Sequence, residues 1–165
     1  MNTDLSLVTH ELSQQLGAAL RRRSWRVTTA ESCTGGGVAS AITEIAGSSE
    51  WFEYGFVTYA NRAKESLLGV ASSTLQQHGA VSEPVVQQMA EGALRAASAQ
   101  LAVAISGVAG PGGGSADKPV GTVWFAWAGN GETVTALHRL DGDRERVRQQ
   151  AVVIALQGLL AKTTV

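Results

Sequence analysis

Apolar residues recur at three- and four-residue steps in three long stretches of the chain, and this spacing predicts amphipathic helices. The first stretch runs from Leu5 to Leu20 and ends at three consecutive arginines. The second begins at Ser82 and continues to about residue 98, and the third covers residues 143–161. Two shorter helices are expected over residues 38–46 and from a cap at Asn61 to Gly69.

Short β-branched, aromatic or apolar runs between these helices predict strands. These runs cover residues 25–30, 53–60, 101–106, 120–128 and 133–140. The run 101–106 is apolar throughout, as is typical of a strand buried on both faces of a sheet. Asn130-Gly131 lies between the last two strands and is a strong hairpin-turn signal. The alternation of strands and helices predicts an α/β layered domain with a mixed sheet and one C-terminal hairpin. No linker or repeat marks a second domain, so residues 1–165 are interpreted as one.

Composition narrows the class of protein. With 44% hydrophobic and 16% charged residues, the chain is unlike a disordered one. A formal net charge of -1 gives no general attraction to nucleic acid or to an anionic membrane. No apolar run reaches the roughly 20 residues of a membrane span, and the first residues lack a signal-peptide pattern, so a cytoplasmic location is expected. The single cysteine, Cys33, excludes an internal disulfide, and the three scattered histidines show no metal-ligand spacing, so no metal is expected.

Three polar or glycine-rich segments follow predicted strands, at residues 31–37, 59–64 and 106–115. In open α/β sheets ligands bind beyond the carboxyl ends of the strands. The first segment, Glu-Ser-Cys-Thr-Gly-Gly-Gly, places two hydroxyls and a thiol before a helix, where free backbone N–H groups can hold a phosphate or an oxyanion. It has neither the ending of a P-loop nor the glycine spacing of a dinucleotide-binding turn. A helix cap at Ser32 or Thr34 is the structural alternative, and the residues alone leave both open.

Lys64 is one of only three lysines. It lies in the short helix expected after the predicted strand 53–60. A buried lysine can lose its charge and serve as the base that activates a serine. The alternative is a solvated lysine on a short helix. Arg144 and Arg148 lie four residues apart on one helix face and could hold a phosphate or carboxylate, or form a salt-bridged first turn. The glycine-rich loop 107–114 could approach a ligand closely or serve as a linker.

Several longer motifs occur in a fixed order between about residues 5 and 160. They are Ala30–Gly36, Gly55–Asn61, Lys64 with Leu68–Val70, Gly79–Glu83, Ser106–Pro111, Lys118–Val123, and Gly142–Arg144 with Arg148. Together they resemble the CinA C-terminal domain family in its stand-alone form. Many relatives have threonine where this chain has Ser106, and the hydroxyl is retained.

The resemblance implies a three-layer α/β/α domain, homo-oligomeric and without a metal or organic cofactor. It implies hydrolysis of the carboxamide of nicotinamide mononucleotide (NMN) to nicotinate mononucleotide and ammonia, a step of pyridine nucleotide salvage and NAD biosynthesis. Ser32 is then the nucleophile, Lys64 its base, and Tyr59 a neighbour that relays a proton or orients the lysine. Substrate contacts are expected from Glu31, Cys33, Thr34, Gly35, Gly36, Ser106, Gly107, Gly110, Arg144 and Arg148.

Three other interpretations stay open. Cys33 could replace Ser32 as nucleophile, with Glu31 and Lys64, as in nitrilase-type amidases, because thiolates are good nucleophiles. Those enzymes are much larger, however, and nothing else in the chain resembles them. The chain could bind a nucleotide or a partner without catalysis, in keeping with the competence-associated role of relatives. It could also be an amidase for another pyridine amide.

Overall fold

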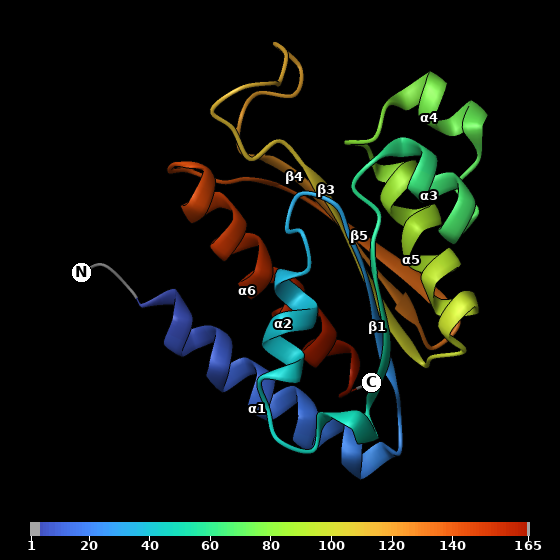
Figure 1. The fold of residues 1–165 in the computed structure, drawn as a ribbon, viewed down its shortest axis with the longest axis vertical. Helices are drawn as coiled ribbons and strands as arrows, with labels where there is room; N and C mark the ends of the chain where they lie inside the picture. Colours follow the sequence, from blue (N-terminus) through green and yellow to red (C-terminus); the bar gives the residue numbers. More distant parts are fainter. Residues whose placement is uncertain (1–3, 165) are drawn as a thin grey trace.

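The computed structural model describes residues 4–164 and shows a five-stranded sheet between two layers of helices (Figure 1). The strand order is β2-β1-β3-β4-β5. The strands are β1 (Val27–Glu31), β2 (Phe52–Val57), β3 (Leu101–Gly107), β4 (Thr122–Gly129) and β5 (Glu132–Arg139). β1 pairs parallel with β2 and β3, whereas β4 and β5 continue the sheet antiparallel. The predicted mixed sheet with a C-terminal hairpin is confirmed.

The helices cover both faces of the sheet, which gives the three layers visible in Figure 1. One layer holds α1 (Leu5–Arg23), α2 (Gly37–Thr43) and α6 (Arg144–Lys162), and the other holds α3 (Asn61–Leu68), α4 (Ser72–His78) and α5 (Glu83–Ala97). A short 3-10 helix, Ser48–Glu50, precedes β2. The sequence pattern missed this turn and α4, because each is shorter than two full periods of a helix. None of the helices within residues 4–164 is long and apolar enough to cross a membrane.

Several predicted boundaries were wrong by one to three residues. β1 starts at Val27 rather than at residue 25, because the N–H of Trp25 donates to Leu20 at the end of α1. β2 ends at Val57 rather than at residue 60, because the chain beyond it turns into α3. Ala60, not Asn61, is the N-cap of α3. Ser82 does precede α5 as predicted, but its hydroxyl donates to Gly79 O instead of capping the helix.

The two faces of the sheet differ in side-chain size. Leu101, Val103 and Ile105 of β3 belong to the core shared with α1, α2 and α6, whereas the alternating residues Ala102 and Ala104 face α5. The small alanines let α5 lie close to the sheet. The predicted burial of this strand on both faces is therefore confirmed, with large residues on one side and small residues on the other.

The connections of the parallel strands fix where a ligand site can form. The chain passes from β1 through α2 to β2 on one side, and then returns over β1 through α3, α4 and α5 to β3 on its other side. The strand order thus reverses around β1, and in open α/β sheets the crevice at such a reversal, beyond the carboxyl ends of the strands, is the usual place for a ligand.

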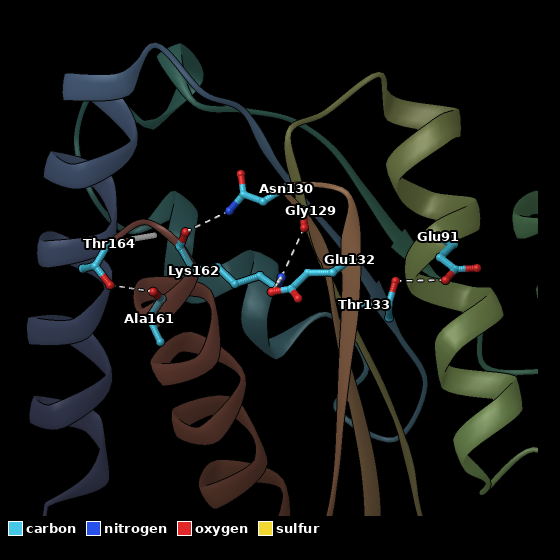
Figure 2. Close-up of polar contacts among 8 residues, drawn as sticks. All are labelled: Glu91, Gly129, Asn130, Glu132, Thr133, Ala161, Lys162 and Thr164. Carbon is cyan, nitrogen blue, oxygen red and sulfur yellow. Dashed lines mark hydrogen bonds and ion pairs between the residues drawn. The ribbon is translucent and has the colours of Figure 1, made fainter.

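At the opposite end of the strands, the β4–β5 turn contacts the C-terminal end of α6 (Figure 2). The side chain of Lys162 is buried, its Nζ donates to Gly129 O over 3.2 Å, and it lies 3.5 Å from Glu132 Oε1. Asn130 and Gly131 have positive φ values of 56° and 76°, as the predicted Asn-Gly turn requires. These contacts tie the end of α6 to the hairpin.

Candidate active site

Ser32 lies directly beyond β1, at the reversal of the strand order. Its N–H donates to Ile105 O of β3 over 3.0 Å, and Glu31 O accepts from the N–H of Thr58 over 2.9 Å. The ladder therefore continues one residue past each strand, and it holds the backbone around Ser32 from both sides. The side chain of Ser32 is 7% exposed.

Lys64 reaches Ser32 from α3, the helix that follows β2. Its Nζ lies 3.1 Å from Ser32 Oγ, 2.8 Å from Thr58 O and 3.0 Å from Tyr59 O. The residue is 1% exposed, so the alternative of a solvated lysine is wrong. Burial lowers the pKa of Lys64 from its ordinary 10.5, because a desolvated ammonium is disfavoured.

The three oxygen neighbours of the lysine nitrogen can accommodate a neutral amine as well as an ammonium. The two N–H groups of a neutral amine can donate to the carbonyls of Thr58 and Tyr59, and its lone pair can then accept the hydrogen of the Ser32 hydroxyl. An ammonium would have to donate to all three oxygens and would leave no acceptor for that hydrogen. With the neutral amine, the geometry therefore suits a serine hydroxyl hydrogen-bonded to a base.

The chain turns sharply between Ser32 and the start of α2. Gly35 and Gly36 have positive φ values of 58° and 100°, a left-handed conformation that side chains oppose. Within the turn, the N–H of Gly35 donates to Ser32 O and the N–H of Gly37 donates to Thr34 O. Across residues 4–164, the N–H groups of Cys33, Thr34 and Gly36 donate to no backbone carbonyl. Three donors of the turn therefore remain available to a ligand.

Glu31 supplies the cap of α2. The N-cap position, Gly36, has no side chain to offer, and the Glu31 carboxylate instead accepts from the N–H of Val38 over 2.8 Å and of Ala39 over 3.0 Å. It also accepts from the Thr34 hydroxyl over 2.7 Å. The predicted alternative of a cap at Ser32 or Thr34 is therefore wrong, and both hydroxyls serve other contacts.

Cys33 has a different environment from Ser32 beside it. Its side chain is buried, and burial raises the pKa of the thiol to about 11, with the charge of Glu31 acting in the same direction. At neutral pH the group is therefore a thiol rather than the nucleophilic thiolate. The two oxygens of Glu31 are occupied by the cap, so a Cys-Glu-Lys arrangement has no free carboxylate.

Two arginines of α6 reach the same region. Arg148 donates from Nε to Cys33 O over 3.1 Å and from Nη2 to Thr34 O over 3.2 Å. Arg144 donates from Nη1 to Gly110 O over 2.9 Å, and its Nη2 lies 3.3 Å from Tyr59 Oη. The predicted common face of these arginines thus joins α6 to the Ser32 turn, to Tyr59 and to the loop after β3.

That loop is held at both ends. Ser106 and Gly107 close β3, and a side chain at Gly107 would meet Thr122 O of β4 at 2.8 Å. Farther along, Lys118 Nζ donates to His78 O at the end of α4 over 2.7 Å. A cavity of about 490 Å³ lies between the loop and the start of α6, lined by Ala109, Pro111, Val120, Gly142, Asp143, Arg144 and Glu145. Its size suits a small molecule.

Thr58 contributes to the site although the sequence gave no reason to select it. It acts through its main-chain carbonyl, which accepts from Lys64, and any residue type supplies that group. Only the path of the chain after β2 could reveal it. Over the described residues 4–164, no three His, Cys, Asp or Glu side chains gather as metal ligands would.

Comparison with known proteins decides the family. The family model described as the CinA C-terminal domain matches residues 9–163. The chain belongs to the CinA C-terminal domain family. Within residues 4–164, the fold and the order of the site segments agree with the resemblance seen in the sequence.

Curated members of the CinA C-terminal domain family resemble the chain over nearly its whole length. Nicotinamide-nucleotide amidohydrolase PncC of Enterobacter agglomerans is 62% identical over 152 residues, covering 92% of this chain and 93% of the relative. The protein of the same name from Escherichia coli K12 is 61% identical over 158 residues, covering 95% and 94%. A CinA superfamily protein from Klebsiella pneumoniae 700603 has a crystal structure with a TM-score of 0.91 and 47% identity, covering 94% of this chain and 98% of that chain.

Proposed function

We propose that this protein is a nicotinamide-nucleotide amidohydrolase, which hydrolyses the carboxamide of NMN to nicotinate mononucleotide and ammonia. Two relatives with more than 60% identity and matching length carry that name. The observation that carries the proposal is the 3.1 Å contact between the buried amine of Lys64 and the Ser32 hydroxyl. A serine with a neutral base needs no metal to attack an amide.

The reaction begins with transfer of the Ser32 proton. Neutral Lys64 takes the hydrogen of Ser32 Oγ as the oxygen attacks the carboxamide carbon, and a tetrahedral intermediate with a negative oxygen forms. The N–H groups of Cys33, Thr34 and Gly36 lie in the same turn without a backbone acceptor, and they are the donors we assign to that oxygen. In a comparable hydrolase one such donor is worth about 2.7–4 kcal/mol of transition-state stabilisation.

In the next step the protonated lysine allows ammonia to leave. The Lys64 ammonium gives its proton to the departing nitrogen, the C–N bond breaks, and an acyl ester on Ser32 and ammonia result. Lys64, neutral again, then takes a proton from water as the water attacks the ester. The Lys64 ammonium returns that proton to Ser32 Oγ as the ester C–O bond breaks, which releases nicotinate mononucleotide and restores the free serine. Tyr59 orients the lysine through its carbonyl, and its hydroxyl is held by Arg144.

The rest of the substrate is placed on the α6 side of the site. We assign the phosphate and ribose to Arg144, to the remaining N–H groups of Arg148 and to the loop 107–114, because these cations lie beside the Ser32 turn and Tyr59. We also assign Ser106, Gly107 and Gly110 to this part of the substrate site. The cytoplasmic location and the homo-oligomeric state stay predictions.

Ammonia release from NMN by the purified protein tests the function. We expect release by the wild type, a loss of at least about a thousandfold in kcat for Ser32→Ala, and retained turnover for Cys33→Ala. Nicotinamide riboside, which lacks the phosphate, should be a much poorer substrate than NMN. No ammonia at micromolar enzyme would favour a binding protein, and full activity of Ser32→Ala would remove the nucleophile from the proposal.

A further inference from the structure

Glu31 stands directly before the proposed nucleophile and is completely buried, with 0% of its surface exposed. Its carboxylate accepts hydrogen bonds from the Thr34 hydroxyl and from the N–H groups of Val38 and Ala39. We infer that Glu31 is a positioning residue for Ser32, acting through the turn that follows it and not through contact with the substrate. The inference rests on the proposed function of Ser32 as a nucleophile.

The contacts of the carboxylate bridge the whole turn. Glu31 is the last residue of β1, Thr34 lies within the turn, and Val38 and Ala39 are in the first turn of α2. The intervening residues include two glycines in left-handed conformation, whose backbone is stiffened by no side chain of their own. The carboxylate therefore links the fixed end of the strand to the start of the helix and limits the movement of the residues between them.

Burial makes these hydrogen bonds costly to break. A carboxylate that has no contact with water relies on protein donors, and hydrogen bonds to a charged acceptor are about twice as strong as neutral ones. A shift of the turn would stretch three of them together. The cost of moving Ser32 away from its 3.1 Å contact with Lys64 is thereby raised.

Arg148 holds the same turn from the side of α6. It donates to the carbonyls of Cys33 and Thr34, while Glu31 takes the Thr34 hydroxyl. With these groups occupied, the N–H groups of Cys33, Thr34 and Gly36 remain in the described chain as turn donors without a backbone acceptor. Loss of the Glu31 contacts should therefore disturb both the nucleophile and the donors assigned to the oxyanion, while the α6 side of the substrate site stays in place.

The variant Glu31→Gln keeps the size of the side chain but replaces one acceptor oxygen by an NH₂ group. That group would face an N–H of α2 or the Thr34 hydroxyl, so at least one bond is lost. We expect kcat for NMN to fall by about tenfold or more with KM changed less than about threefold. The pH dependence set by Lys64 should keep its shape. The matched control is Glu53→Gln, because Glu53 is an exposed carboxylate on β2 paired with Arg26, far from the turn in sequence.

A second readout is independent of NMN. A fluorophosphonate probe reacts with Ser32: the bond between Oγ and phosphorus forms, the P–F bond breaks with release of fluoride, and the serine proton passes to Lys64. The rate of labelling therefore reports the reactivity of the serine. We expect labelling of Ser32 at least about tenfold slower in Glu31→Gln than in the wild type and in Glu53→Gln. If the wild type is labelled but releases no ammonia from NMN, the proposed substrate is wrong and the labelling comparison still decides the role of Glu31.

The hydrogen bond from Thr34 to Glu31 can also be removed from the threonine side, which carries less risk to folding. Thr34→Val removes the hydroxyl that donates to Glu31, and Thr34→Ser keeps it, so labelling should be slower in the valine variant than in the serine variant. These variants decide the matter if Glu31→Gln does not fold. Unchanged labelling in folded Glu31→Gln, or in folded Thr34→Val, overturns the inference. So does a rise in KM with kcat preserved, which indicates contact with the substrate, and so does a wild type that is not labelled at Ser32.

Discussion

At the scale of single residues, the protonation of Lys64 decides what the site can do. A charged lysine cannot accept the proton of Ser32, and the enclosure of Lys64 by protein lowers its pKa. Its two carbonyl acceptors also fix the amine in the one orientation that leaves the lone pair for serine. Ser32 and Cys33 are neighbours, yet only the serine hydroxyl lies beside the amine, and the thiol is held protonated by its raised pKa.

The lowered pKa of Lys64 predicts how activity depends on pH. With Lys64 as the proposed base, the neutral amine is the active form. We therefore expect kcat/KM to rise with pH and then level off, with the midpoint of the rise below the ordinary pKa of 10.5. Lys64→Arg should be inactive at every pH, because a guanidinium keeps its proton. The measurement is kcat/KM for NMN between about pH 5 and 10, with the stability of the protein checked at each pH. A rise centred at or above 10.5, or an active Lys64→Arg, would contradict this base.

At the scale of elements, the position of Lys64 depends on how closely α3 lies to α5. A Cβ added at Gly92 of α5 would collide with the carbonyl of Leu68, the last residue of α3. The absence of a side chain therefore allows the backbones of the two helices to touch. This contact holds α3, the helix that carries Lys64, against α5.

Gly92→Ala should therefore destabilise the protein despite the better helix propensity of alanine. That propensity is worth about 1 kcal/mol, whereas forcing a methyl group against a backbone carbonyl costs about 1–3 kcal/mol, and the helices must separate. We expect the free energy of unfolding to fall by up to about 2 kcal/mol, measured by urea denaturation, together with a fall in kcat. Gly112→Ala is the control, because its added Cβ meets nothing within 4 Å and should change stability by less than about 0.5 kcal/mol. A more stable Gly92→Ala protein would refute the close contact.

At the scale of the whole molecule, α6 connects the site with the opposite end of the strands. Its first turns carry Arg144 and Arg148 at the site, and its last turn carries Lys162 at the β4–β5 turn. We therefore expect separable roles for the two ends, the proposed one in substrate binding and one in stability.

Lys162→Met should lower stability and leave catalysis intact. The substitution keeps the apolar length of the side chain but removes the donor to Gly129 O, and a buried carbonyl without its partner costs about 1–3 kcal/mol. The ion pair with Glu132 adds little, because that carboxylate is 60% exposed. We expect the free energy of unfolding to fall by about 1–2 kcal/mol, with kcat and KM for NMN unchanged well below the melting temperature. Glu132→Gln is the control and should cost less than about 1 kcal/mol; an equal loss in both variants would assign the effect to the ion pair.

The amino-acid pattern by itself determined the layers of this protein and the candidates for its chemistry. Apolar periodicity fixes the long helices α1, α5 and α6, and the apolar run of β3 fixes a central strand, because both depend on residues close in sequence. The Asn-Gly hairpin turn is predicted for the same reason, because its signal lies in two adjacent residues. It could not give α4 or the ends of β1 and β2, where capping and sheet pairing with distant segments set the boundaries.

Only the tertiary structure decided which candidates meet and in what state. Ser32 and Lys64 are 32 residues apart, and their contact depends on the crossing of the chain over β1 and on the depth at which α3 is buried. The sequence could equally place Lys64 in solvent, and it selected Glu31 without showing that its carboxylate caps α2. Residue type sets which groups can donate, accept or attack, whereas burial and the partners brought by other elements set their charge and direction.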